Sequence, residues 1–412
     1  SCMRNFRISD FAMAADTVDV FSNLSAAKHA WKMSSRSERN VSSIRTPIVF
    51  RLIRERCTRC ACHVRYVSFV LESTSGACAR GGGYGTIMGL HTYNDTITME
   101  NLLAAWEGFL RGKRHKKDVM EFETRLSENI ATLHRDLLRK TYVHGPYSEF
   151  HVSDPKPRTI HKAAVRDRLL HHLLHRALYP HFERRFIHDS YACRKNKGIH
   201  RALNRFNIFA RKVSKNHTRT CYVLKCDIKR FFASVDQRIL QRILERHIND
   251  KDVRWLLGQV ISSFYVTRPG LGLPLGNLTS QLLANVYMHE FDMFMKQELR
   301  VRYYIRYADD FMILSDDKTY PQLLLPKIQM FLQDNLHLAL HEDKVSIETY
   351  ASGVDFLGWV HFPYHRRLRT ITKRRIIRNV RRYPRPETIN SYRGLLKHGS
   401  TYTIQKRVLS LG

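Results

Sequence analysis

The sequence contains no long run of apolar residues and has few acids for its size. It has 37 Asp and Glu residues against 69 Lys and Arg residues, a formal net charge of +32 over 412 residues. Without an apolar run, nothing in the chain is expected to span or anchor in a membrane. The first residues, SCMRNFRISDF, lack the apolar core of a secretory signal. The basic excess predicts a polyanionic partner, most simply a nucleic acid.

Cysteine is also sparse. The eight cysteines form no regular framework, which favours reduced thiols and a cytoplasmic protein. The stretch RCTRCACH has the residue types of a zinc site, but a zinc knuckle needs a second, well-spaced ligand pair and only Cys78 follows nearby. We therefore interpret the members of this stretch as incidental thiols beside a histidine: Cys57, Cys60, Cys62 and His63.

The chain changes character near residue 99. Residues 1–98 show no clear periodicity and are predicted to be a segment of unknown role, disordered or foreign to the folded protein, with a natural start as late as Met88 or Met99. From Glu100 on, predicted helices alternate with short strands, which indicates an α+β or α/β sheet domain. One amphipathic helix is predicted from apolar residues three or four apart: Val119, Phe122, Leu126, Ile130, Leu133 and Leu137.

Two further helical stretches carry polar side chains of interest. His171 and His175 lie one helical turn apart, and we interpret them as partly exposed histidines rather than metal ligands because no suitably spaced acid accompanies them. The stretch HRRLRTITKRRIIRNVRRYPR is basic and contains no acid. It predicts a folded helix whose basic face suits a phosphate backbone and whose apolar side contains Leu368, Ile371, Ile376, Ile377 and Val380.

Two adjacent acids, Asp309 and Asp310, interrupt the strand-like stretch YYIRYADDFMIL. Ala308, Asp309 and Asp310 are predicted to form a hairpin turn at the rim of a sheet, where like charges repel and desolvation is costly. Asp227 ends another apolar strand, CYVLKCDI, and would join them if the two strands were neighbours. Two Mg²⁺ ions roughly 3.5–4 Å apart would offset the repulsion and support an in-line displacement at phosphorus. A surface Asp turn is the alternative.

These blocks occur in an order that resembles the reverse transcriptases. KPRTIHKAAVRDRLL is similar to the fingers motif of that family, CDIKRFFASVD to its palm strand, YADD to its acidic hairpin, and LHEDKVSI and VDFLGW to its last palm blocks. The resemblance runs from about Glu100 to the C-terminus. It implies an RNA-directed DNA polymerase with an α+β, right-hand fold. Fingers would occupy residues 99–225, a palm with an antiparallel sheet 226–362, and a basic helical thumb 363–412.

The resemblance assigns roles to the acids and to one lysine by motif position. Asp227, Asp309 and Asp310 match the carboxylates that bind two Mg²⁺ ions in that family. Lys344 matches a palm lysine proposed to protonate the departing pyrophosphate; a solvated lysine is the alternative.

Nucleotide-binding residues follow from the same motifs. Lys156 and Arg158 match fingers residues that hold the triphosphate. Phe232 matches a steric gate, a ring that would collide with a ribose 2′-OH. A core phenylalanine is the alternative, and Phe231 fits that description equally well.

The loop GLPLGNLTSQLLAN indicates the kind of reverse transcriptase. Leu275 precedes Gly276 where most relatives carry Gln, and Gln281 follows Ser280 where they carry Ser-Pro. This loop resembles those of diversity-generating retroelements, whose reverse transcriptases copy a template-repeat RNA into cDNA with frequent errors at adenines. The resemblance implies template RNA, cDNA and dNTPs as ligands and a small basic accessory variability protein as partner. Leu275 has no hydrogen-bonding group and is predicted to loosen base selection, unless it only packs under the loop.

Two other functions remain open at this point. One is another bacterial reverse transcriptase, of the retron, group II intron or antiphage defence kind. The other is a basic RNA-binding scaffold whose acids are structural.

Overall fold

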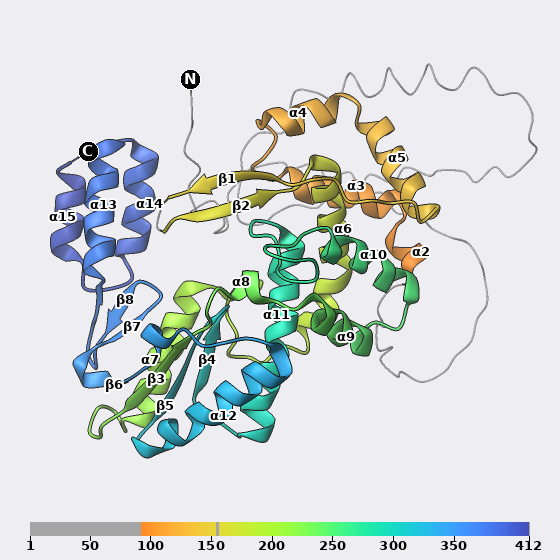
Figure 1. Ribbon diagram of the computed structural model, residues 1–412. Coiled ribbons are helices and arrows are strands. Elements are labelled where there is room, and N and C mark those ends of the chain that lie inside the picture. The colour runs from red at the N-terminus through yellow and green to blue at the C-terminus, as the bar shows by residue number, and fades with distance from the viewer. Residues whose placement is uncertain (1–91, 154–155, 412) are drawn as a thin grey trace, which may run out of the picture. The chain divides into compact units, whose positions relative to one another are not determined.

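The computed structural model describes residues 92–153 and 156–411 (Figure 1). The cysteine–histidine stretch at 57–63, the proposed start at Met88, and residues Asp154 and Pro155 lie outside the described residues. The first described helix, α2 (Tyr93–Thr96), buries Tyr93 in the main core together with Ile97. Ordered core residues therefore begin before position 99.

The N-terminal half is mostly helical. The predicted amphipathic helix is two helices, α4 (Lys117–Thr124) and α5 (Leu126–Leu138), because Arg125 leaves helical geometry at φ −121° and ψ 39°. Its apolar residues still bury or pack against one core. The other helices of this half are α3 (Met99–Leu110) and α6 (Val165–Glu183). Between α5 and α6, strands β1 (Ser148–Val152) and β2 (Arg158–Lys162) form an antiparallel pair.

A four-stranded antiparallel sheet lies at the centre of the C-terminal half. Its strand order is β4-β5-β3-β6, with β3 at Tyr222–Asp227, β4 at Tyr304–Tyr307, β5 at Asp310–Ser315 and β6 at Ser346–Thr349. A second, three-stranded sheet contains β7 (Val354–Phe356), β8 (Trp359–His361) and β9 (Arg366–Leu368).

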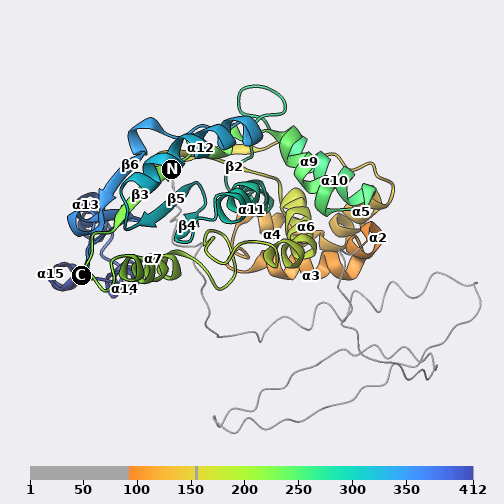
Figure 2. The same ribbon diagram turned by 90° about the horizontal axis from the view of Figure 1, so that it is seen from below.

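Alternating residues of the central strands enter two different cores, because successive side chains of a strand point to opposite faces. One face packs with α11 (Leu278–Met293) and α12 (Thr319–Leu336), and the other with α7 (Ile199–Val213). Figure 2 shows α12 and α7 on opposite sides of the sheet. The first core contains Leu224, Tyr304, Phe311 and Ile313, and the second contains Val223, Ile305, Met312 and Leu314.

The C-terminus is a bundle of α13 (Thr370–Arg382), α14 (Pro386–Leu396) and α15 (Tyr402–Leu409). Ile376 and Val380 of α13 are fully buried, as the apolar pattern predicts. Ile371 is instead 76% exposed and Leu368 belongs to β9, so the apolar side of the helix is narrower than predicted. Short helices α8 (Phe231–Ser234), α9 (Gln237–His247) and α10 (Lys251–Ser262) complete the fold.

The predicted α+β fold class, with its antiparallel sheet and helical C-terminal part, is confirmed. Among residues 92–153 and 156–411, no helix is both long and apolar enough to cross a membrane.

Candidate active site

The three acids singled out in the sequence come together at one end of the central sheet. Strands β3 and β5 are neighbours, and their register pairs Asp227 with Asp310. Asp310 is the first residue of β5 rather than part of the turn, so the predicted three-residue turn is two residues long. Ala308 and Asp309 form it, with Ala308 in the left-handed region at φ +57°.

Burial and mutual repulsion raise the pKa of two of these carboxyls. Burial is the largest cause for Asp309, the charge of Asp227 adds to it, and the charges of Arg158 and Lys344 oppose it. For Asp310, burial comes first, followed by a hydrogen bond with Asp227 and the charge of Asp309, and together they raise its pKa to about 7. The negative charge of these acids is therefore neutralised either by protonation or by a cation bound beside them.

Lys344 supplies one such cation. It ends a short 3₁₀ turn, Glu342–Lys344, just before β6, the strand beside β3. Its Nζ donates to Asp227 Oδ1 at 2.6 Å. The Lys344 side chain is 38% exposed and ion-paired with an acid that is 13% exposed, so it is partly solvated and partly held at the site.

Hard oxygen donors of this kind suit divalent cations such as Mg²⁺. Within the described part of the chain, no three His, Cys, Asp or Glu side chains already stand in metal-binding geometry. The Lys344 ammonium instead neutralises Asp227, while Asp309 and Asp310 are half-buried and have raised pKa values. We conclude that the carboxylates fit a divalent cation by chemistry and charge.

The histidines of α6 do not form a second metal site. His171 is 1% exposed, which corrects the prediction of a partly exposed side chain. It lies 3.2 Å from His144, Nε2 to Nε2, and not against His175, whose ring stacks on Tyr179. The spacing of histidines along α6 could not indicate His144 as a partner of His171, because His144 lies well before the start of that helix.

Among the nucleotide-binding candidates, Arg158 begins β2, Lys156 lies just before it, and Phe232 belongs to α8. Lys156 and Arg158 are exposed, and Arg158 lies near enough to Asp309 to lower the pKa of that carboxyl. Phe231 is 2% exposed and belongs to the core, whereas Phe232 is only partly buried. Of the two rings, Phe232 is therefore the one with surface to offer a nucleotide.

The loop before α11 is attached to β2. The Leu275 carbonyl accepts from the His161 N–H at 2.9 Å, and Asn277 Nδ2 donates to the His161 carbonyl at 3.0 Å. Gly276 has φ +106°, and a Cβ there would stand 2.6 Å from Ile160 Cγ2. This position therefore requires glycine. Leu275 is half-buried, so it both packs and keeps some exposed surface.

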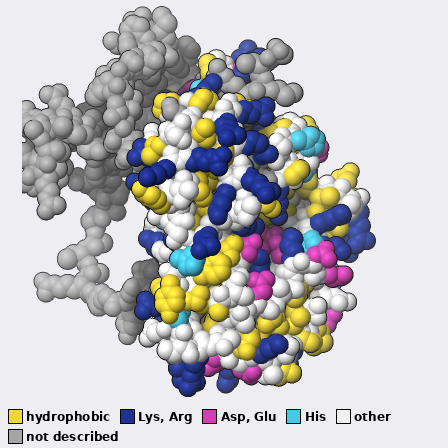
Figure 3. Space-filling model, turned by 90° about the vertical axis from the view of Figure 1, so that its left-hand side faces the viewer, with side chains coloured by type: hydrophobic (Ala, Val, Ile, Leu, Met, Phe, Trp, Pro, Cys, Tyr) yellow, Lys and Arg dark blue, Asp and Glu magenta, His cyan; other side chains and the backbone are white. Residues whose placement is uncertain are grey.

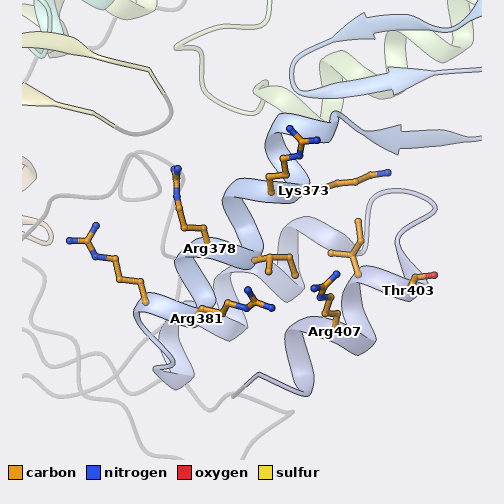
Figure 4. A pocket seen from close by; sticks show the side chains of 9 residues that line it. Lys373, Arg378, Arg381, Thr403 and Arg407 are labelled. Atoms are coloured by element: carbon orange, nitrogen blue, oxygen red, sulfur yellow. The ribbon is translucent and has the colours of Figure 1, made fainter.

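A basic groove lies between α13 and α15. It encloses about 640 Å³, and none of the nine described residues that line it is acidic. Figure 3 shows Lys and Arg side chains spread over the upper part of the face that carries these helices. Figure 4 shows Arg381 and Arg407 extending toward each other from the two helices. The groove also contains Lys373, Arg374, Arg378 and Arg382.

An antiparallel sheet with acids at one end, beside cations on a separate hairpin, is the arrangement of a nucleotidyl-transferring enzyme. Residues 152–361 match the family model described as reverse transcriptase (RNA-dependent DNA polymerase). The chain belongs to the reverse transcriptase family and carries the domain of an RNA-directed DNA polymerase, with its right-hand fold.

Several known proteins are similar to it. Protein YkfC of Escherichia coli (strain K12) is 25% identical over 276 residues, which are 57% of this chain and 72% of YkfC. Group II intron-encoded protein LtrA of Lactococcus lactis subsp. cremoris is 21% identical over 302 residues, 56% of this chain and 49% of LtrA. A structure of apo telomerase from Candida Tropicalis, truncated from its C-terminal domain, is 11% identical with a TM-score of 0.42, covering 58% of this chain and 59% of that one. The chain thus spans about half of LtrA.

Proposed function

We propose that this chain copies a template-repeat RNA into adenine-mutagenised cDNA for a diversity-generating retroelement. The polymerase part rests on the family and on the Asp227–Asp310 register pair with Asp309 in the adjoining turn. The retroelement part rests on the loop, where Leu275 precedes Gly276 and Ser280 is followed by Gln281.

In this proposal Asp227, Asp309 and Asp310 hold two Mg²⁺ ions. Reverse transcriptases generally use divalent metal ions, which neutralise the phosphates and activate the primer hydroxyl. Arg158 supports this assignment because it stands close enough to influence the Asp309 carboxyl from a separate hairpin. A triphosphate bound between Arg158 and the carboxylates would have a cation on one side and metal-bound acids on the other.

The remaining candidates act around that triphosphate. Lys156 and Arg158 neutralise it. Lys344, held at the site by Asp227, supplies a proton to the departing pyrophosphate. The half-exposed ring of Phe232 excludes a ribose 2′-OH. Leu275 lies where the loop meets the fingers strand and offers an incoming base no hydrogen bond.

The basic groove supports a nucleic-acid role for the C-terminal bundle. Its cations face a volume without any lining acid, and Glu387 is the single acid in residues 370–412. An anion bound between facing cations reduces their electrostatic repulsion. In a template–primer duplex, that anion is the phosphate backbone. We therefore assign residues 363–412 to the thumb. From the order of the sequence motifs, we also assign residues 99–225 to the fingers and 226–362 to the palm.

Primer extension on an RNA template tests the polymerase. Asp309→Asn should abolish cDNA synthesis but leave RNA binding nearly intact, because it removes a metal ligand at a turn and no core group. Asp316→Asn, which changes an exposed acid beyond the other end of β5, is the matched control. Substantial polymerisation by Asp309→Asn would contradict the assignment. RNA binding by the wild type without any Mg²⁺-dependent extension would favour the scaffold alternative.

The similarity to LtrA favours a second candidate, a reverse transcriptase of the group II intron kind. Sequencing of cDNA made from one defined RNA separates the two. Errors concentrated opposite template adenines support the retroelement, and uniformly rare errors support the intron kind. The assay should be run with and without the accessory variability protein, which we propose as a partner.

A further inference from the structure

An arginine inside the acidic hairpin is completely buried. Arg306 of β4 is 0% exposed, and all five of its side-chain N–H groups are hydrogen-bonded. Nε and Nη2 form a bidentate pair with Asp292 of α11, at 2.7 and 2.5 Å. Nη1 donates to Asn285 Oδ1 at 3.3 Å and to the Ala308 carbonyl at 3.0 Å, and Nη2 also donates to Ser190 Oγ at 3.2 Å.

The bond to Ala308 connects this network to the acids. Ala308 holds φ +57°, a left-handed conformation that is strained for a non-glycine residue. Its carbonyl belongs to the peptide group whose nitrogen is that of Asp309. A guanidinium that holds this carbonyl fixes the orientation of the peptide and, with it, the position of the Asp309 carboxylate.

The guanidinium is itself held from several directions. Asp292 and Asn285 project from α11, and Asn285 also donates to the Ala192 carbonyl at 2.9 Å. The backbone of Arg306 pairs with the segment before α7, donating to Asp189 O and accepting from the Tyr191 N–H, each at 3.0 Å. Arg306 therefore joins a helix, a loop and a strand directly beneath the turn.

We propose that Arg306, fixed by Asp292, is a positioning residue that sets the divalent-metal affinity of the polymerase site through the Ala308 carbonyl. This inference rests on the proposed function, in which Asp309 is a metal ligand. Groups that orient metal ligands typically change metal affinity by ~10–100-fold when they are lost. A buried ion pair alone would not require this role, since such a pair is often replaceable by apolar side chains without loss of stability.

The test compares two changes within one network. Arg306→Lys retains the charge opposite Asp292 but lacks the five-donor fork that reaches Ala308 at the same time. Tyr304→Phe is the matched control, because the Tyr304 hydroxyl donates to Asp292 Oδ1 at 2.7 Å and its bonds do not include the turn. Two quantities are measured for each: the Mg²⁺ concentration that gives half-maximal primer extension, and the calorimetric Kd for Mn²⁺ without nucleic acid.

We expect both quantities to rise at least ~10-fold in Arg306→Lys, with excess metal restoring most of kcat, and to stay within about twofold in Tyr304→Phe. The double variant Arg306→Met/Asp292→Leu removes the buried charges together, so it tests the same loss of metal affinity if Arg306→Lys does not fold. Wild-type Mn²⁺ affinity in a folded variant that lacks Arg306 overturns the inference. An equal loss in Tyr304→Phe also overturns it, because the effect would then follow stability. A wild type that binds Mn²⁺ but extends no primer contradicts the proposed function instead.

Discussion

The basic groove of the C-terminal bundle leads to a quantitative prediction about nucleic-acid binding. Arg378 and Arg381 of α13 and Arg407 of α15 line it. Replacing all three with alanine should weaken binding to an RNA–DNA hybrid and make the remaining binding less sensitive to salt. Stability should change little, because alanine is the better helix former and arginines three residues apart repel each other.

The magnitude follows from counterion release. Each phosphate contact contributes ~0.7–0.9 to the slope of log K against log salt concentration. Three lost contacts lower that slope by about 2.1–2.7. Between 50 and 200 mM KCl, the wild type should therefore lose roughly 20–40-fold more affinity than the triple variant.

Fluorescence anisotropy with a labelled hybrid measures both slopes. A triple alanine variant at Arg238, Arg242 and Lys327 is the control, because it removes the same charge from exposed positions on α9 and α12. An equal fall in slope for both variants would mean that only net charge matters. An unchanged slope in the groove variant would refute the assignment of the groove to nucleic acid.

Three further outcomes are expected. Phe232→Ala should let ribonucleotides compete with deoxynucleotides in primer extension, and an unchanged selectivity ratio would return Phe232 to a packing role. Leu275→Gln should lower misincorporation opposite template adenines, as measured by sequencing the cDNA. The decrease should be at most about tenfold, because that is the largest discrimination that the net free energy of one hydrogen bond provides. Burial, followed by the charge of His144, lowers the pKa of His171 to about 3. Its contribution to stability is therefore present above the ordinary pKa near 6.5 and is lost as pH falls below it, by ~1.4 kcal/mol per pH unit. His171→Gln should lower the slope of the unfolding free energy against pH by up to that amount between pH 6.5 and 5.5, as measured by urea unfolding, and an unaltered slope would contradict the burial argument.

Much of the candidate site could be predicted because it depends on local pattern. Short apolar runs marked β3 and β5 as strands, and an acid at the end of a strand lies at a sheet rim whatever the strand's neighbours are. The basic, acid-free stretch after residue 364 similarly predicted α13, because an apolar stripe at helical spacing is visible in the order of residues alone.

Other features depend on residues that lie far apart in the chain. Lys344 reaches Asp227 across 117 positions, and local periodicity carries no information about such a partner. His171 was predicted to be partly exposed and is buried, since His144, which is itself hydrogen-bonded to Tyr147, approaches it from another segment.

The sequence by itself determined the strands, their terminal acids and the basic helix, because hydrophobic period and charge are properties of adjacent residues. The tertiary structure alone decided that β5 lies beside β3 and so pairs Asp310 with Asp227. It also decided that the arginine of YIRYADD is buried against Asp292. A guanidinium and a carboxylate are tolerated at 0% exposure only when each meets the other, and that meeting exists only once α11 has packed on the sheet.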